Sequence, residues 1–341
     1  MKDDYLVVAE NVSKFFPIRR DLSDIVLRRP LHYVKAVDNV SFKIKKGEIS
    51  VLVGESGCGK TTLGKLLLRA YMLSSGRIYF DGNDISTFKG EKLKQFRKTA
   101  QIIFQDPYAS LDPRFTAWDV LNEPLHIHNI GSTKEERKEI IFQAMEDVKL
   151  VPPEDFLERF PHMLSGGQRQ RLAMARTLVL EPKFIVADEP VSMLDLSIRA
   201  EILELMFSLK HRRNITYLYI THDLSTARYV GDTIGIMYLG KIVEMGRAKD
   251  VIEKPLHPYT QALLDAVPEP DPSNRLKDRQ VRITGEIPSP ANIPSGCSLH
   301  PRCPYAFAPC PKNYPELKEI SGGRLVSCYL YDPTVSDVKT D

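Results

Sequence analysis

The nine residues from Gly54 to Thr62, GESGCGKTT, have the types and the spacing that bind the phosphates of a nucleotide. Glycines allow the backbone to curl so that consecutive N–H groups point at a phosphate chain, Lys60 can reach the β- and γ-phosphates, and the Thr61 hydroxyl can bind Mg²⁺. An apolar run at 49–53 precedes the loop and leucines at helical spacing follow it, so strand, loop and helix are in the required order. We therefore predict a P-loop, the alternative being a glycine-rich turn without a ligand. The expected nucleotide-binding residues of this loop are Gly54, Glu55, Ser56, Gly57, Cys58, Gly59, Lys60, Thr61 and Thr62.

A predicted strand at residues 183–188 ends in two consecutive acids, Asp188 and Glu189. An acid at a buried strand end can orient the coordination shell of Mg²⁺, and its neighbour can polarise a water molecule against a γ-phosphate. We expect Asp188 to bind the metal and Glu189 to act as the general base. A cap for the following helix is the alternative interpretation of this acidic pair.

Two other predicted strands end in polar residues that could reach the same nucleotide. An apolar strand runs into Gln105, whose amide can contact Mg²⁺ or a water molecule. The strand at 215–220 is followed by His222, and although a lone histidine is usually structural, ligands bind at the carboxyl ends of strands in nucleotide-binding sheets. The expected catalytic residues are Glu189, His222 and Gln105, and the expected Mg²⁺ ligands are Thr61, Gln105 and Asp188.

A second glycine-rich segment, LSGGQRQR at 164–171, leads directly into a predicted helix. Small residues at a helix start leave several N–H groups free, which makes an anion site. The expected phosphate contacts are Ser165, Gly166, Gly167 and Gln168. An ordinary glycine-rich helix cap is the alternative.

An aromatic residue upstream of the P-loop could stack on an adenine ring. Phe16 is the expected stacking residue, with Phe15 as a neighbouring choice and Tyr33 as a further candidate. A ring that packs into the adjoining sheet would explain the same pattern.

The composition limits the class of protein. With 341 residues and 43% hydrophobic residues, the chain is long enough for two domains. A net charge of +3 with 27% charged residues gives no argument for a nucleic-acid partner. The start of the chain has acids where a signal peptide needs a basic flank, and no apolar run approaches the roughly 18 residues of a membrane-spanning helix. We therefore expect an intracellular protein whose contact with a membrane is made through a partner.

The order of predicted elements indicates an α/β fold. Short strands between Leu6 and Ile44 suggest an antiparallel sheet, interrupted by a basic segment at 18–35 that we interpret as a solvated hairpin. Residues 115–180 are mainly helical, with a capping box formed by Thr133 and Glu136. A short helical pattern between prolines at 254–272 indicates a linker, so a domain boundary is expected near residue 255.

Four of the five cysteines lie close together near the C-terminus, at Cys297, Cys303, Cys310 and Cys328. Their gaps of 5, 6 and 17 residues contain no C-x-x-C pair, so spacing alone does not choose between zinc, an iron–sulfur cluster, disulfides and free thiols. In a reducing compartment a metal is expected before disulfides, and a four-thiolate centre would stabilise a tail with little core of its own. Cys58 is expected to face phosphate and not to join them.

The order of these motifs resembles that of the ATP-binding subunits of ABC transporters, from Leu6 to about Pro272. The likeness to the oligopeptide and dipeptide importers extends over nearly the whole chain through FQDPYASLDPR, DEPVSMLDLSI, HPYTQALL and GCSLHPRCPYAFAPC. GGQRQR and DEPVS are more like the "F" type of subunit, whereas Met193 departs from the usual alanine. The resemblance implies a P-loop NTPase core of ABC-ATPase type with an antiparallel β subdomain and a helical subdomain. The implied limits are 1–255 for the nucleotide-binding domain, about 91–180 for its helical subdomain, and 256–341 for a small Cys-rich C-terminal domain.

The same resemblance implies a function and partners. Two subunits would pack head to tail, so that the P-loop of one and the LSGGQ of a homologous, non-identical partner close on one ATP with Mg²⁺. Two membrane permease subunits, contacted through Gln105 and the loop at 106–114, would hold the protein at the cytoplasmic face of the cell membrane. An extracytoplasmic binding protein would select oligopeptides or dipeptides, with β-linked oligosaccharides or nickel as alternatives. A soluble ABC-type ATPase without membrane partners is a further alternative. Some tails of this kind hold a [4Fe–4S] cluster, which favours that centre for the four cysteines.

Overall fold

The structure is a computed structural model that describes residues 4–18, 20, 32–267 and 283–332. One of its two sheets is antiparallel, with strand order β2-β1-β4-β5. Its strands are β1 (Tyr5–Pro17), β2 (Tyr33–Lys45), β4 (Ser75–Phe80) and β5 (Asn83–Asp84). The expected antiparallel sheet between Leu6 and Ile44 is confirmed, because β1 and β2 pair along most of their length. Most of the expected basic hairpin, at 19 and 21–31, lies outside the described residues.

The second sheet has eight strands in the order β11-β12-β10-β9-β3-β8-β7-β6. Their bounds are β3 (Ile49–Val53), β6 (Ala100–Ile103), β7 (Phe184–Asp188), β8 (Thr216–Thr221), β9 (Thr233–Tyr238), β10 (Lys241–Arg247), β11 (Lys318–Ser321) and β12 (Arg324–Val326). The five strands from β9 to β6 are parallel. All residues of β3, β7 and β8 are buried, as expected for parallel strands covered on both faces. The carboxyl ends of β3, β6, β7 and β8 therefore meet at one edge.

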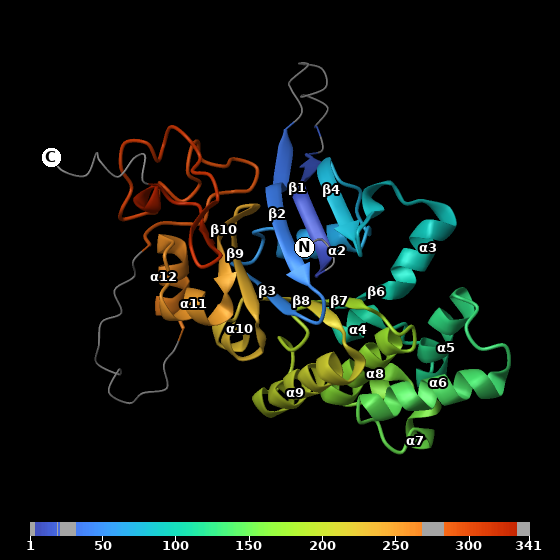
Figure 1. Cartoon of the computed structure of the whole chain (residues 1–341). Helices are drawn as coiled ribbons and strands as arrows, with labels where there is room; N and C mark the ends of the chain where they lie inside the picture. Colours follow the sequence, from blue (N-terminus) through green and yellow to red (C-terminus); the bar gives the residue numbers. More distant parts are fainter. Residues whose placement is uncertain (1–3, 19, 21–31, 268–282, 333–341) are drawn as a thin grey trace, which may run out of the picture.

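Helices cover the larger sheet and form a separate group beside it (Figure 1). The α-helices are α2 (Lys60–Leu67), α3 (Gly90–Thr99), α4 (Pro107–Ser110), α5 (Ala117–Ile127), α6 (Lys134–Asp147), α7 (Glu154–Leu157), α8 (Gly166–Leu178), α9 (Leu196–Arg213), α10 (Leu224–Val230), α11 (Ala248–Glu253) and α12 (Pro258–Asp265). Short 3₁₀ turns are η1 (Ile85–Thr87), η2 (Pro161–Met163) and η4 (Tyr329–Tyr331). The capping box of Thr133 and Glu136 opens α6, as expected. Within the described ranges, no helix is long and apolar enough to cross a membrane.

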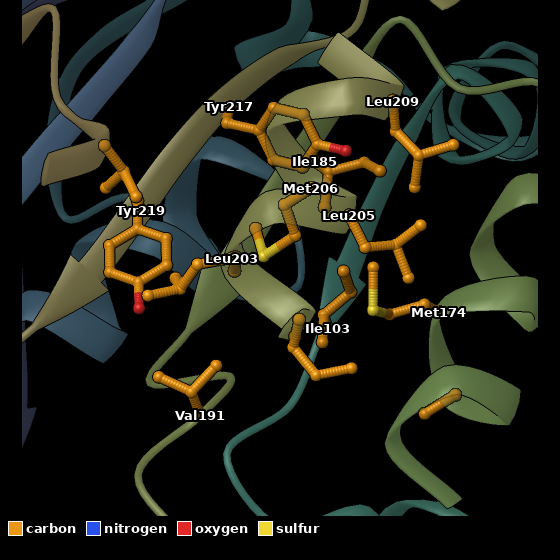
Figure 2. Close-up of a cluster of buried hydrophobic side chains, with 14 of the residues drawn as sticks. Ile103, Met174, Ile185, Val191, Leu203, Leu205, Met206, Leu209, Tyr217 and Tyr219 are labelled. Atoms are coloured by element: carbon orange, nitrogen blue, oxygen red, sulfur yellow. The ribbon is translucent and has the colours of Figure 1, made fainter. Parts of the chain in front are cut away.

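Successive side chains of a strand point to opposite faces of the sheet, and both faces of the parallel sheet are covered. Ile185 in β7 packs toward α8 and α9, where Figure 2 shows it beside Met206 and Tyr217. Its neighbour Val186 belongs to the core on the other face, together with Leu63 of α2 and residues of the antiparallel sheet. The sheet thus forms the middle layer between the helices and the smaller sheet.

The C-terminal region is attached to the nucleotide-binding sheet. Strand β12 pairs with β10, and Glu244 in β10 is fully buried. Its carboxylate accepts hydrogen bonds from the backbone N–H groups of Leu256 at 3.0 Å and His257 at 2.9 Å, and from Arg324 Nη2 at 2.7 Å. The linker interpretation of 254–272 is corrected for its first half, because His257 and the start of α12 are buried against this sheet, and residues 268–272 lie outside the described residues. The domain limits given above stay predictions.

Candidate functional site

A cavity of about 660 Å³ opens at the edge where the parallel strands end. The P-loop follows β3, Gln105 follows β6, Glu189 follows β7 and His222 follows β8. The residues that line the cavity are Val34, Ala36, Gly54, Glu55, Ser56, Gly57, Gly59, Lys60, Thr61, Thr62, Gln105, Glu189, His222 and Leu263. The fold therefore brings the predicted P-loop and the three predicted catalytic side chains to one place.

The P-loop conformation depends on its glycines. Gly57 and Gly59 have φ angles of +80° and +109°, which residues with a side chain rarely adopt. A Cβ atom on Gly59 would lie 2.0 Å from the Ala36 carbonyl oxygen, so the loop packs directly on β2. The Lys60 ammonium donates to the carbonyl oxygens of Gly54 at 2.6 Å and Glu55 at 3.0 Å. This lysine is thus held at the mouth of the loop, where a phosphate chain would lie.

Thr61 and Asp188 form the part of the site that suits a cation. The Thr61 hydroxyl donates to Asp188 Oδ1 at 3.0 Å. Burial raises the pKa of Asp188, and the hydrogen bond from Thr61 partly opposes this. Hydroxyl and carboxylate oxygens are ligands that Mg²⁺ prefers, so the pair fits this ion. Gln105 points to Glu189 instead, and its role as a metal ligand stays a prediction.

Glu189 lies between the other two predicted catalytic residues. Its Oε2 atom accepts a hydrogen bond from Gln105 Nε2 at 3.0 Å and lies 3.1 Å from His222 Nδ1. Glu189 has a φ angle of +46°, a strained conformation for a residue with a side chain. Its backbone N–H donates to the Ile220 carbonyl oxygen, which holds the strained turn against β8. A carboxylate fixed in this way can polarise a water molecule in the cavity.

The LSGGQ segment lies at the start of α8, away from the P-loop of the same chain (Figure 1). The Ser165 side chain accepts from the Gln168 N–H at 3.2 Å, and the Gln168 side chain accepts from the Ser165 N–H at 3.0 Å. Ser165 is exposed, and Gly166 and Gly167 form the first turn. The described residues that line the cavity do not include this segment. Of its predicted phosphate contacts, Ser165 is exposed, and Gly166, Gly167 and Gln168 are half-buried.

Phe16 does not line the cavity. Its ring makes an edge contact with the Tyr71 ring at 5.6 Å, and the Lys14 ammonium lies 4.9 Å from the Phe16 centroid. Val34 and Ala36 of β2 occupy the nearby part of the cavity wall. Tyr33 is exposed. Stacking of Phe16 on adenine stays a prediction.

Cys58 requires a correction. Its side chain is 4% exposed and belongs to the core cluster that contains Leu63 and Met237, so the thiol faces the interior and not the phosphate site. The curl of the loop explains this direction. Its N–H groups point to the side where a phosphate would bind, so the Cys58 side chain points to the other side of the loop. Burial raises the pKa of this thiol.

Sequence reasoning missed the contribution of α12. Leu263 lines the cavity, and Tyr259 accepts a hydrogen bond from the Glu55 backbone N–H at 3.1 Å. These residues are about 200 positions away from the P-loop, as the separation of 204 between Glu55 and Tyr259 shows. Only the HPYTQALL pattern, interpreted as part of a linker, marked the helix that carries them.

The four C-terminal cysteines line one small cavity of about 20 Å³ together with His257 and Tyr305. Burial raises the pKa of Cys297 to about 11 and that of Cys328 to about 12. The donor set suits a thiolate centre, but the cavity holds little more than a water molecule. Among the described residues, no group of three or more His, Cys, Asp or Glu side chains is arranged to hold a metal ion. The predicted four-cysteine metal site is therefore not confirmed.

The fold and the P-loop site define an ATPase of the ABC type. Residues 37–192 match the family model described as ABC transporter, and residues 243–310 match the model for the C-terminal region of oligopeptide/dipeptide transporters. The chain belongs to the family of oligopeptide/dipeptide ABC-transporter ATP-binding proteins.

Individual relatives agree with this assignment. The chain is 48% identical to the oligopeptide transport ATP-binding protein AppF of Bacillus subtilis, covering 94% of this chain and 96% of AppF. It is 42% identical to the dipeptide transport ATP-binding protein DppF of Haemophilus influenzae, covering 96% and 97%. Among solved structures, the dimeric ATP-binding cassette MJ0796 bound to ADP and phosphate has a TM-score of 0.62 at 28% identity, covering 71% of this chain and 98% of that one.

Proposed function

We propose that this protein is the ATP-hydrolysing subunit of an ABC importer that takes up oligopeptides or dipeptides. The observation that carries the proposal is the convergence of Gln105, Glu189 and His222 on the P-loop cavity. The names of the similar proteins AppF and DppF support the choice of peptides as the solute.

The residues of the cavity have distinct roles in this proposal. The P-loop N–H groups and Lys60 would bind the triphosphate, and Thr61 and Asp188 would hold Mg²⁺, which would neutralise phosphate charge when bound. Gln105 and His222 fix Oε2 of Glu189, so that Oε1 can polarise the attacking water. His222 also contributes a polar side chain at the mouth of the cavity.

A partner ATPase completes the site. Ser165 is exposed and the two half-buried glycines after it form the first turn of α8, where their N–H groups would meet ATP bound to another subunit. The dimeric state of the similar cassette MJ0796 supports this arrangement. We further propose that the partner is homologous but not identical, because the chain resembles one of two paired subunit types.

The surface around the Gln105 loop suits the membrane permeases. Tyr71, Phe104 and Tyr108 are exposed aromatic residues, and a groove of about 400 Å³ is lined by Tyr71, Phe104 and Arg97. Because Gln105 contacts Glu189, a permease seated in this groove would communicate with the water-activating residue. Two permeases would place the protein at the cytoplasmic face of the membrane, and a solute-binding protein would deliver the peptide.

The test is uptake by the reconstituted transporter, with its permeases, partner ATPase and binding protein in vesicles. We expect Mg-ATP to drive uptake of labelled oligopeptides or dipeptides. The matched control carries Glu189→Gln and should bind ATP without uptake. Uptake of nickel or a β-linked oligosaccharide in place of peptides would overturn the choice of solute, and ATP turnover with no associated permease would overturn the importer assignment.

We also propose that the protein holds a structural [4Fe–4S] cluster on Cys297, Cys303, Cys310 and Cys328. The cavity of about 20 Å³ between these residues is too small for the cluster, so the surrounding chain would have to move apart when the cluster binds. The four cysteine side chains that line one cavity support the proposal, and these residues would supply the four thiolate ligands. Anaerobic purification followed by iron, sulfide and zinc analysis tests it. About four irons per chain, lost in Cys303→Ser, are expected. Stoichiometric zinc, disulfides or metal-free thiols would refute the cluster.

A further inference from the structure

The C-terminal region contacts the P-loop through two side chains that the ATPase mechanism does not use. The Tyr259 hydroxyl of α12 accepts a hydrogen bond from the Glu55 backbone N–H at 3.1 Å. Arg302, in the cysteine-bearing segment, places Nη1 at 3.7 Å from Glu55 Oε2 and donates to the Tyr238 hydroxyl at 3.3 Å. The rings of Tyr238 and Tyr259 lie 4.6 Å apart, so both contacts belong to one packed group.

The Tyr259 contact acts on the peptide unit that holds the P-loop lysine. The Glu55 N–H and the Gly54 carbonyl belong to one planar peptide group. The N–H side is fixed by Tyr259, and the carbonyl side accepts the Lys60 ammonium at 2.6 Å. A rotation of this peptide would break both bonds. The Tyr259 hydroxyl therefore sets the orientation of the group from which Lys60 leaves to reach phosphate.

The Arg302 contact acts on charge beside the phosphate site. Glu55 lines the nucleotide cavity, and its Oε2 atom is buried without a hydrogen bond from any described residue. A carboxylate in this place repels a triphosphate. The Arg302 side chain is 12% exposed and brings a positive charge to within 3.7 Å of this oxygen, so it offsets the repulsion.

The Tyr259 side chain is held in place by the sheet. Tyr259 is 1% exposed, and the backbone just before it is bonded to the buried carboxylate of Glu244. His257 caps α12 by accepting the Tyr259 N–H at 3.1 Å. The hydroxyl of Tyr259 is therefore placed by the sheet and not by a mobile tail.

We propose that Tyr259 and Arg302 are positioning residues for the P-loop, through which the C-terminal region sets the affinity of the site for ATP. The inference rests on the nucleotide site proposed above. It gives the buried His-Pro-Tyr segment a function in nucleotide binding.

The first test measures Mg-ATP binding by the full-length subunit with calorimetry. Tyr259→Phe removes only the hydroxyl, and we expect the Kd to rise about three- to tenfold. The matched control is Tyr331→Phe, whose hydroxyl in the same region donates to the Leu256 carbonyl at 3.0 Å. The control should bind ATP like the unaltered protein. Equal Kd values for Tyr259→Phe and the unaltered protein would overturn the role of the hydroxyl.

The second test separates positioning from a general loss of structure. Arg302→Gln leaves the Glu55 carboxylate uncompensated, and ATP binding should weaken about threefold or more. Adding Glu55→Gln removes that charge, so the double variant should return to within about twofold of the unaltered affinity. A double variant as weak as Arg302→Gln would overturn the charge argument. Lys60→Ala tests the nucleotide site itself. If this variant binds ATP normally, the proposed nucleotide site is wrong. If only Tyr259→Phe binds ATP normally, the role of Tyr259 is refuted and the nucleotide site stands.

Discussion

Replacement of Glu244 by alanine should release the C-terminal region from the sheet. Glu244 is fully buried in β10 and pairs with Arg324 of β12 at 2.7 Å. The same carboxylate accepts the N–H groups of Leu256 and His257. The alanine variant therefore buries a guanidinium without its carboxylate and leaves two backbone donors without their acceptor.

The expected loss in the free energy of unfolding follows from these three lost contacts. Removal of one partner of a buried ion pair costs about 3–5 kcal/mol because the other charge stays buried. Each N–H group left unsatisfied adds about 1–3 kcal/mol unless water reaches it. Water entry and local opening limit the sum, so we expect a loss of about 4 kcal/mol in the free energy of unfolding, concentrated in β11, β12 and the start of α12.

Glu201 provides a matched control. It pairs with Arg171 at the same distance of 2.7 Å, but its side chain is 56% exposed, whereas that of Glu244 is 0% exposed. Exposed ion pairs contribute about 0–1 kcal/mol, so Glu201→Ala should change stability little. Urea unfolding measures the free energy, and hydrogen exchange at β12 locates the opening. Similar losses for the two variants would refute the argument, since Glu244 differs from Glu201 in its burial and in the two backbone N–H groups that it accepts.

Three other predictions concern the P-loop, the core and assembly. Gly59→Ala should abolish ATP binding in calorimetry, because the added Cβ meets the Ala36 carbonyl at 2.0 Å; binding with unchanged affinity would contradict the close packing of the loop on β2. Leu63→Ala, at a site that is 0% exposed, should destabilise the protein by about 2–5 kcal/mol in urea unfolding, and a loss below about 1 kcal/mol would show that α2 is not packed as described. Light scattering of the intact transporter should show two ATPase subunits, which ATP draws together and ADP does not; one ATPase copy with full activity would refute the shared site.

The sequence was informative wherever a function depends on neighbouring residues. The P-loop lies between its own strand and helix, so its spacing alone predicts the order of strand, loop and helix around Lys60. Gln105, Glu189 and His222 were predicted as strand-end residues, and they meet because β6, β7 and β8 are parallel neighbours. Because these strands are parallel, their carboxyl ends lie at the same edge of the sheet, and the three residues that follow them line one cavity.

Long-range packing could not be predicted in the same way. Nothing near Tyr259 indicates that its hydroxyl reaches a peptide group 204 positions earlier. The pairing of β12 with β10 depends on a buried carboxylate, Glu244, which looks like an ordinary polar residue of a hairpin in the sequence. Cys58 also faces the core, because the direction of a side chain within a curled loop is fixed by the glycines around it.

We propose that Glu189 activates water for ATP hydrolysis at the P-loop. The most direct measurement is the steady-state ATP turnover of the assembled transporter carrying Glu189→Gln, together with its Kd for Mg-ATP. Because glutamine keeps the shape but cannot act as a base, we predict a fall in turnover of about 10²- to 10⁴-fold with nearly unchanged binding. Turnover within a few fold of the unaltered transporter would contradict the assignment of Glu189 and the mechanism built on it.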